Sequence, residues 1–387
     1  MKYAFIIQGE GRGHLTQAIA LGEILTNAGH EVGFMLVGTA DGGQAPTFFS
    51  EKVKSNIVTF QSPCLVYCKK TKALDVNKTL INSFLGFKRF ILSIGKIQKT
   101  IRQYQPDVII NFYDVLGGFY NLIFNQGRIP FICTAHQYLL LHPAFEHPKC
   151  NWIDKFLVNL NTRITALWAT KKLALSFTPF ADDKKQNIIA VPPLLRSDLQ
   201  HLKPQNNDFI LAYMTQSSLV EDLIKWHEAN PEVRIHCFTD KKQEKAEVDF
   251  STNLTFHQIN GQKFLAFMQN CRVLVTTAGF ESVCEAMFLG KPVMMVPVPK
   301  HYEQACNGLD AQRAGAGVVA NTFDLDILLN YLPKHQDISA DFRQWQSESA
   351  RIFLREISVS PAIETVFEPK EIRFDWQIQT SILSEIK

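Results

Sequence analysis

The chain has 387 residues, which is too long for one ordinary hydrophobic core and long enough for two α/β domains. Its hydrophobic fraction of 46% and charged fraction of 20% are those of a folded globular protein and exclude a disordered chain. The formal net charge is only +3, so charge gives no reason to expect a nucleic acid as partner.

Targeting and metal-binding signals are weak throughout the sequence. No apolar run reaches the roughly 18 residues of a membrane-spanning helix, and the apolar start at residues 3–7 is too short for a signal peptide. The eight cysteines lack the paired spacing of a zinc site and are expected as reduced thiols. We therefore expect a cytoplasmic protein with no metal and no cofactor.

Short apolar segments alternate with amphipathic ones along the first half of the chain. This alternation predicts a parallel, doubly wound sheet with helices on both faces. Strands are expected at residues 3–7, 30–37, 56–60, 107–112, 129–134 and 173–177, and a helix at residues 14–28.

The first expected strand runs into a glycine-rich turn that ends in Gly11, Arg12, Gly13 and His14. Glycines let the backbone approach a ligand closely, and the helix that follows offers free N–H groups to an anion. A dinucleotide-binding turn would need its third glycine one position later, where His14 stands. NAD and flavin are therefore disfavoured.

His14 is the candidate catalytic residue of this turn. Imidazole titrates near neutral pH, so His14 could act as a general base or bind an acceptor hydroxyl. The alternative is a histidine that caps the helix or braces the turn, and the strand–helix junction favours the catalytic interpretation. Arg12 either meets an anionic group in a cleft or is an ordinary solvated arginine.

Two stretches of the first half combine apolar and basic residues. Residues 83–102 predict a basic amphipathic helix, and residues 152–172 form a second such stretch. Either could lie on an anionic membrane, which would indicate a lipid-linked acceptor and a peripheral position on the inner face of the membrane. The alternative, which we weigh somewhat higher, is a pair of packed helices with ordinary basic surfaces.

A proline-containing stretch, residues 191–207, separates the first series of elements from a second. We expect domains at residues 1–192 and 208–357, with ligand in the cleft between them, and a tail at residues 358–387 of uncertain packing. Strands are expected at residues 209–214, 233–238, 254–258, 273–276 and 292–297, and helical structure at residues 342–357.

The second half carries the most specific pattern, a strand followed by Gly279, Ser282 and Glu285. Gly279 permits close approach to a diphosphate, and Ser282 in the first helical turn adds a hydroxyl donor. Glu285 lies one turn further on the same helix face, where a carboxylate can accept both hydroxyls of a ribose. Glu303 and Gln304 then stand together at a helix start, where they could bind sugar hydroxyls or be an ordinary polar helix start.

Together these motifs resemble the donor site of GT-B glycosyltransferases, closest in pattern to the peptidoglycan N-acetylglucosaminyltransferase and diacylglycerol glucosyltransferase group. The resemblance spans roughly residues 4–320 and implies two Rossmann-like domains facing across a cleft. It implies inverting, metal-independent transfer from a nucleotide sugar, usually UDP-linked, with His14 as base or acceptor-side group. The donor-binding residues that it implies are Thr215, Gln216, Ser217, Gly279, Phe280, Ser282, Glu285, Glu303 and Gln304.

Three positions depart from the pattern of the family. Ala278 stands where many members have glycine, Thr277 where plant-type enzymes have a phosphate-binding histidine, and Glu281 where they have an amide. We expect sugar transfer from a nucleotide sugar to a small-molecule or lipid acceptor. The alternatives are a non-hydrolysing sugar-nucleotide epimerase and a non-catalytic protein that binds nucleotide sugar or lipid.

Overall fold

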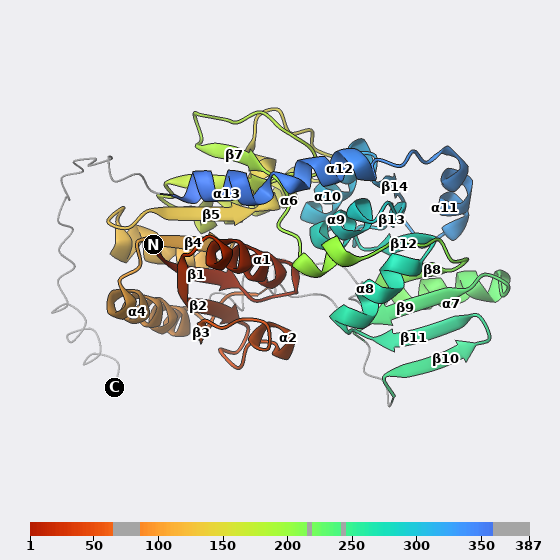
Figure 1. The fold of residues 1–387 in the computed structure, drawn as a ribbon, viewed down its shortest axis with the longest axis horizontal. Helices are drawn as coiled ribbons and strands as arrows, with labels where there is room; N and C mark the ends of the chain where they lie inside the picture. The colour runs from red at the N-terminus through yellow and green to blue at the C-terminus, as the bar shows by residue number, and fades with distance from the viewer. Residues whose placement is uncertain (65–85, 215–218, 241–244, 359–387) are drawn as a thin grey trace.

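The structure is a computed structural model that describes residues 1–64, 86–214, 219–240 and 245–358. Within these ranges the chain forms two sheets of seven strands each, one in either half of the sequence. Figure 1 shows the first half of the chain at the left and the second half at the right, each with helices packed against its sheet. The predicted pair of doubly wound α/β domains is therefore confirmed.

The first sheet has the strand order β3-β2-β1-β4-β5-β6-β7 and is parallel throughout. β1 lies in its interior, and its residues 3–7 are fully buried because helices cover both faces. The strands are β1 (Lys2–Gln8), β2 (Glu31–Thr39), β3 (Asn56–Gln61), β4 (Val108–Phe112), β5 (Phe131–Ala135), β6 (Lys171–Leu175) and β7 (Ile188–Val191). Its helices include α1 (Gly13–Asn27), α2 (Thr47–Ser50), α4 (Phe87–Tyr104), α5 (Val115–Tyr120) and α6 (Trp152–Thr165).

The second sheet has the order β10-β11-β9-β8-β12-β13-β14, and only its edge pair β10–β11 is antiparallel. The strands are β8 (Ile210–Met214), β9 (Ile235–Thr239), β10 (Glu247–Ser251), β11 (Leu254–Gln258), β12 (Val273–Thr276), β13 (Val293–Met295) and β14 (Gly317–Val319). The helices are α7 (Val220–Ala229), α8 (Gly261–Asn270), α9 (Phe280–Phe288), α10 (Tyr302–Arg313), α11 (Leu325–Tyr331), α12 (Ser339–Ser347) and α13 (Ser349–Ile357).

The structure contains three strands that the sequence pattern did not predict. β7 directly precedes two prolines and was assigned in part to the linker. β10 is an edge strand whose residues are mostly exposed, so it lacks an apolar signal, and β14 has only three residues. The helical segment expected at residues 342–357 is two helices, α12 and α13, which meet at Glu348.

The C-terminal helix α13 packs on the first domain, although the predicted boundary placed it in the second. α13 contacts α1 and β7, and the Nζ atom of Lys171 on β6 lies 3.0 Å from the Glu356 carboxylate. The indole of Trp345 on α12 donates to the carbonyl of Ser176, 3.0 Å away. Figure 1 shows α12 and α13 running back from the second domain over the first. The tail from residue 359 lies outside the described residues.

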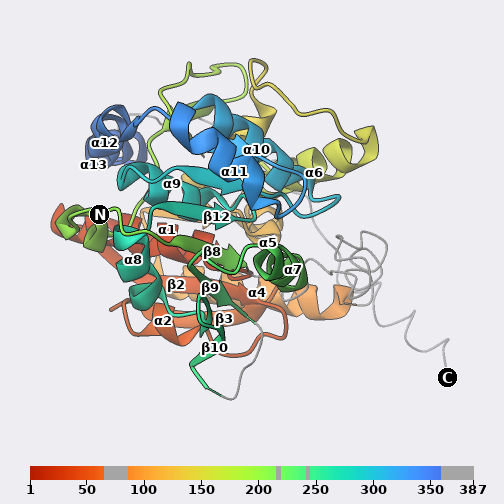
Figure 2. The same cartoon turned by 90° about the vertical axis from the view of Figure 1, so that its right-hand side faces the viewer.

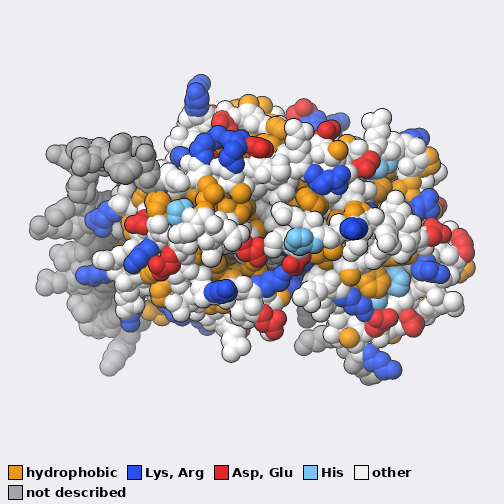
Figure 3. Space-filling model, viewed as in Figure 1, with side chains coloured by type: hydrophobic (Ala, Val, Ile, Leu, Met, Phe, Trp, Pro, Cys, Tyr) orange, Lys and Arg blue, Asp and Glu red, His pale blue; other side chains and the backbone are white. Residues whose placement is uncertain are grey.

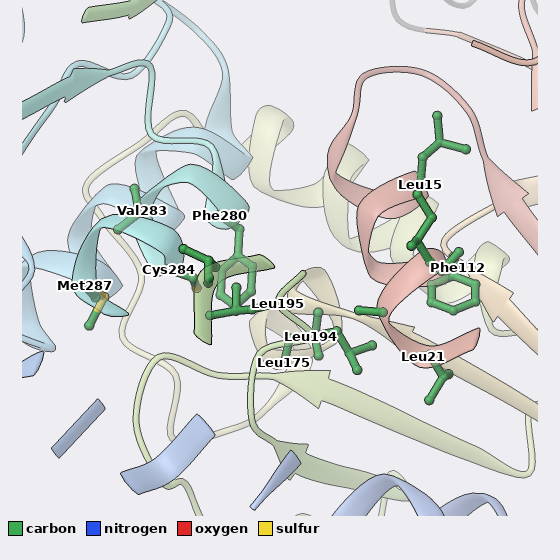
Figure 4. Packing of buried hydrophobic residues seen from close by; sticks show 14 of the residues in the cluster. Leu15, Leu21, Phe112, Leu175, Leu194, Leu195, Phe280, Val283, Cys284 and Met287 are labelled. Carbon is green, nitrogen blue, oxygen red and sulfur yellow. The ribbon is translucent and has the colours of Figure 1, made fainter. Parts of the chain in front are cut away.

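One apolar cluster is shared by the two domains. It includes residues of α1 and β4 in the first domain, and residues of α9 in the second. Leu194 and Leu195, which follow β7, are 0% and 8% exposed and lie between the two groups. Figure 4 shows them beside Phe280 and Cys284 of α9, with Leu21 of α1 further along the same cluster.

The two stretches proposed for membrane contact contain helices α4 and α6, which lie apart in Figure 2 and both contact α5. Three isoleucines of α4, Ile94, Ile97 and Ile101, are buried against the first domain, while Ile91 and Leu92 are exposed. Packing thus accounts for much of the apolar face of α4, and residues 83–85 lie outside the described ranges. α6 exposes more apolar surface, including Trp152, Phe156 and Leu160.

The surface carries charges of both signs. On the face seen in Figure 3, basic and acidic side chains are intermingled, as expected from the net charge of +3. In the described part of the chain, no helix has both the length and the apolar character that crossing a membrane requires.

Candidate functional site

The two domains border one cavity with a volume of about 910 Å³. In the first sheet the strand order reverses at β1 and β4, and in the second at β8 and β12. Doubly wound folds bind ligands outside the carboxyl ends of such strands. The helices that follow β1 and β12 begin at this cavity, because Gly13 and Gly279 both line it. Ligand sites usually occupy about 300–1,000 Å³, so this one is large.

His14 lies in the first turn of α1 and lines the cavity. Its ring stacks on Tyr113 with 5.5 Å between centroids, and its Nδ1 atom lies 3.2 Å from Oε1 of Gln17. Burial lowers the pKa of His14 to about 4, and the hydrogen bond to Gln17 opposes this shift only in part. The imidazole is therefore neutral at physiological pH and able to accept a proton.

Arg12 points toward the second domain from the glycine turn. Its guanidinium lies 3.8 Å from the ring centroid of Phe48, and a nitrogen of Arg12 approaches Gly261 at the start of α8. A nitrogen of Arg196 approaches the same glycine. Burial lowers the pKa of Arg12, and the charge of Arg196 lowers it further. Two guanidinium groups this close favour an anion beside them. Gly11, with φ of +78°, lets the chain turn at this point.

The turn before α9 is built for close approach by a ligand. Ala278 has φ of +59°, a left-handed conformation that costs a residue with a side chain about 1–2 kcal/mol. Asn307 of α10 holds this turn by donating to the Ala278 carbonyl at 3.1 Å. Gly279 is the N-cap of α9 and makes no side-chain cap, so the first N–H groups of the helix remain for a ligand. The Ser282 hydroxyl lies 3.3 Å from the Gly279 carbonyl.

Glu285, the predicted ribose ligand, is 2% exposed and paired with Arg196. The Nε atom of Arg196 donates to Oε1 of Glu285 at 2.6 Å, and Nη1 donates to the Gly261 carbonyl at 3.2 Å. The linker between the domains thus supplies a cation to the cavity. Because Oε1 of Glu285 accepts from Arg196, the second oxygen, Oε2, is the atom that would make the predicted contact with a ribose.

Glu303 and Gln304, at the start of α10, line the same cavity. Gln137 of the first domain donates to Oε1 of Glu303 at 3.0 Å. Burial raises the pKa of Glu303 to about 7, and the charge of Glu10 adds to the shift. Oε1 of Gln304 accepts from the backbone N–H of Val298 at 2.8 Å, so its amide nitrogen is the group left to bind a sugar hydroxyl.

Phe280 was predicted as a donor-binding residue, but its ring lies in the contact between the domains. The ring stacks on His136 at 4.3 Å and contacts Phe177 at 4.6 Å, both in the first domain. Phe280 also lines the cavity, so its predicted role in donor binding stays a prediction. Thr215, Gln216 and Ser217 lie outside the described residues, so their predicted role stays a prediction.

The structure brings several residues to the cavity that sequence reasoning did not select. Gln17 lies three residues after His14 on the same helix face, and this spacing could have identified it. Arg196 follows two leucines in the linker and has no local motif. Tyr113, which has φ of +60°, follows β4, and Gln137 follows β5. Both could have been selected by the general rule that ligands bind at the carboxyl ends of the strands.

Comparison with known proteins identifies the family of the chain. The family described as Glycosyl transferase family 1 matches residues 1–334, which is most of the chain. The chain belongs to Glycosyl transferase family 1. As a glycosyltransferase, it is an enzyme that transfers sugar from a nucleotide sugar. The epimerase and the non-catalytic binding protein are set aside by this assignment.

Relatives of this glycosyltransferase cover most of its length. A Lactobacillus acidophilus protein named UDP-N-acetylglucosamine–N-acetylmuramyl-(pentapeptide) pyrophosphoryl-undecaprenol N-acetylglucosamine transferase is 34% identical over 265 residues, which are 64% of this chain and 69% of that protein. An uncharacterized glycosyltransferase of Methanosarcina mazei is 21% identical over 341 residues, 82% of this chain and 85% of the relative. Phytolacca americana UGT2, solved with UDP-2-fluoro-glucose and pterostilbene, shares the fold with a TM-score of 0.60 at 14% identity, over 91% and 95% of the two chains.

Replacing Arg196 by methionine should destabilise the protein, because it leaves the buried Glu285 carboxylate without its cation. We expect a loss of about 3 kcal/mol in the free energy of unfolding, measured by urea denaturation. Arg272→Met is the matched control, since Arg272 and its partner Asp208 are 53% and 93% exposed, and it should cost less than about 0.5 kcal/mol. Equal effects of the two substitutions would contradict the buried pairing.

Glu281 should make stability depend on pH between about 4.5 and 8. Burial raises its pKa from 4.5 to about 8, so between these values the folded protein binds more protons here than the unfolded chain. The contribution of Glu281 to the free energy of unfolding is therefore lost as pH rises from 4.5 through 8. Glu281→Gln should gain stability relative to the wild type between pH 6 and pH 9, as seen in melting temperatures. Parallel pH curves for the two proteins would refute the buried carboxyl.

Proposed function

We propose that this glycosyltransferase moves a sugar from UDP to a hydroxyl group of a lipid acceptor, without a metal ion and with inversion at the anomeric carbon. The observation that carries the proposal is the meeting of α1 and α9 at one cavity. The start of α9, with Gly279, Ser282 and Glu285, would bind the donor. His14, on the opposite domain, would face the acceptor.

In the proposed reaction, the acceptor oxygen forms a bond to the anomeric carbon while its proton passes to Nε2 of His14. The bond from the anomeric carbon to the diphosphate oxygen breaks, and its electron pair leaves with UDP. N–H groups at the start of α9 and the guanidinium of Arg12 would stabilise the charge that develops on the diphosphate. The base lies on one domain, and the leaving diphosphate would be held by the other. This arrangement supports a single displacement and hence inversion.

UDP is proposed as the nucleotide for two reasons. The relative from Lactobacillus acidophilus is named for a UDP-linked donor, and the Phytolacca americana enzyme was solved with a UDP-sugar analogue. Glu285 at the ribose position and Glu303 with Gln304 at the sugar position agree with such a donor. The sugar itself would be selected by the amide of Gln304 and the carboxyl of Glu303, which line the cavity side by side.

A lipid acceptor is proposed from the exposed face of α6. Trp152, Phe156 and Leu160 follow one another at four-residue spacing and are 74%, 56% and 41% exposed. Leu160 also lines the cavity, as do further residues of the same helix. An apolar stripe that leads into a catalytic cavity fits an acceptor with a hydrocarbon tail, held at the inner face of a membrane. Lys149, Lys155 and Arg163 lie on or beside this helix and would meet anionic headgroups.

His14→Ala should abolish most turnover while leaving donor binding intact. A positioned general base contributes about 10²- to 10⁴-fold to rate, so we expect kcat to fall within that range. Donor binding is measured by thermal shift with UDP, GDP, TDP and NAD, where UDP alone should raise the melting temperature of both proteins. Full activity of the variant would remove His14 as the base, and a wild type that responds to no nucleotide would sink the donor proposal.

The stripe on α6 should mediate binding to anionic vesicles. In flotation with vesicles of phosphatidylcholine and phosphatidylglycerol, Trp152→Ser with Phe156→Ser should weaken binding at least about tenfold, because each buried aromatic side chain contributes about 1.5–3 kcal/mol. Phe250→Ser, an exposed phenylalanine of β10 in the other domain, is the control and should bind as the wild type does. Absence of wild-type binding at low salt would remove the membrane contact.

A further inference from the structure

Three polar side chains form a line of hydrogen bonds from one domain to the other. Nδ1 of His14 lies 3.2 Å from Oε1 of Gln17, and Nε2 of Gln17 donates to Oε1 of Glu281 at 2.6 Å. His14 and Gln17 belong to α1, whereas Glu281 lies in the first turn of α9. A Cβ atom on Gly13 would lie 3.4 Å from Cγ of Glu281, so this side chain rests on the glycine turn. The hydrogen bond between Gln17 and Glu281 therefore crosses from one domain to the other.

The amide of Gln17 has an acceptor end and a donor end, and its orientation decides what His14 meets. An ionised carboxylate only accepts hydrogen bonds, so it turns the nitrogen of Gln17 toward Glu281. The oxygen of Gln17 then faces Nδ1 of His14 and requires a proton on that atom. A neutral imidazole carries one N–H, so Nε2 keeps its lone pair.

Several features favour the charged form of Glu281 in this contact. A separation of 2.6 Å is short for a nitrogen–oxygen hydrogen bond and is typical of one assisted by charge. Glu281 lies in the first turn of α9, where the helix dipole favours an anion. Gln17 is only 3% exposed, so water does not compete for its amide. Burial and the nearby Glu285 oppose the anion and raise the pKa of Glu281 to about 8, whereas the hydrogen bond from Gln17 and the charge of Arg196 favour it, so Glu281 ionises near that pH.

We propose that Glu281 and Gln17 are positioning residues for His14, the ionised carboxylate orienting the amide and the amide holding the proton of His14 on Nδ1, so that Nε2 is the base. The inference rests on the proposed role of His14 in the reaction. It makes the base of the first domain depend on a carboxylate of the second. It also joins the base to the helix that would hold the donor diphosphate, because Glu281 lies between Gly279 and Glu285 on α9.

The tautomer of His14 can be observed without any reaction. In protein labelled with ¹⁵N-histidine, with the His14 signals assigned by their loss in His14→Ala, the wild type at mildly alkaline pH should show a protonated Nδ1 and an unprotonated Nε2. Gln17→Leu should remove this preference. A wild-type His14 protonated on Nε2, or a tautomer unchanged in Gln17→Leu, would overturn the proposal even if His14 proves to be the base.

Kinetics supply a second readout. Gln17→Leu and Glu281→Leu should each lower kcat about 10- to 100-fold, part of what a positioned base contributes, with little change in the KM for the donor. In a His14→Ala background neither substitution should lower kcat further, since both act through His14. Glu281→Gln keeps an oxygen that can accept from Gln17 and should restore part of the activity. Glu228→Leu, at an exposed site of α7, is the control and should leave kcat unchanged.

The pH profile separates positioning from mere packing. The charged and titratable groups that face Glu281 are Glu285 and Cys284 on α9, Arg196 of the linker and, through Gln17, His14. The pKa of His14 is about 4, far below that of Glu281, so wild-type kcat should rise between pH 7 and pH 9 as Glu281 ionises. Glu281→Gln should lose this rise. A rise of equal size in both proteins would contradict the proposal, and full activity of His14→Ala would overturn the proposed base as well.

Discussion

The apolar contact between the two domains is the constraint on which the site depends. Phe280, at the start of α9, stacks on His136 and contacts Phe177 of the first domain, and the leucines of the linker fill the space beside them. Directly next to this contact the polar groups of both domains face the cavity. Because the apolar cluster fixes how α1 and α9 approach each other, it also fixes the distance from His14 to the start of α9.

The cavity concentrates carboxyl groups in a place that disfavours their charge. Glu281 and Glu303 have raised pKa values because they are buried, whereas Glu285 lies against Arg196. Such groups lower the stability of the folded protein when they ionise, which is common where binding and catalysis need charge in a closed site. The cations that balance them, Arg12 and Arg196, come from the glycine turn and the linker. The charged groups of the cavity thus come from separate parts of the chain.

The fold was accessible from sequence because it rests on local patterns, and the predicted donor motif rests on a local pattern as well. Buried strands are continuous apolar runs, and Gly279, Ser282 and Glu285 share one strand–turn–helix unit. Contacts between the domains were not accessible, since the pairing of Arg196 with Glu285 joins positions 89 residues apart and that of Gln17 with Glu281 joins positions 264 apart. The position of Phe280 in the motif predicted a contact with the donor. The contacts of its ring with His136 and Phe177 could not be predicted, because both partners lie far away in the sequence. The packing of α13 on the first domain also depends on distant contacts.

The return of α13 has a mechanical consequence. The chain passes between the domains twice, once through the linker after β7 and once between α12 and α13, and Lys171 with Glu356 anchors the second crossing. Two connections restrict relative movement of the domains more than a single linker does. An opening of the cavity would have to bend the chain both in the linker and at the junction of α12 and α13.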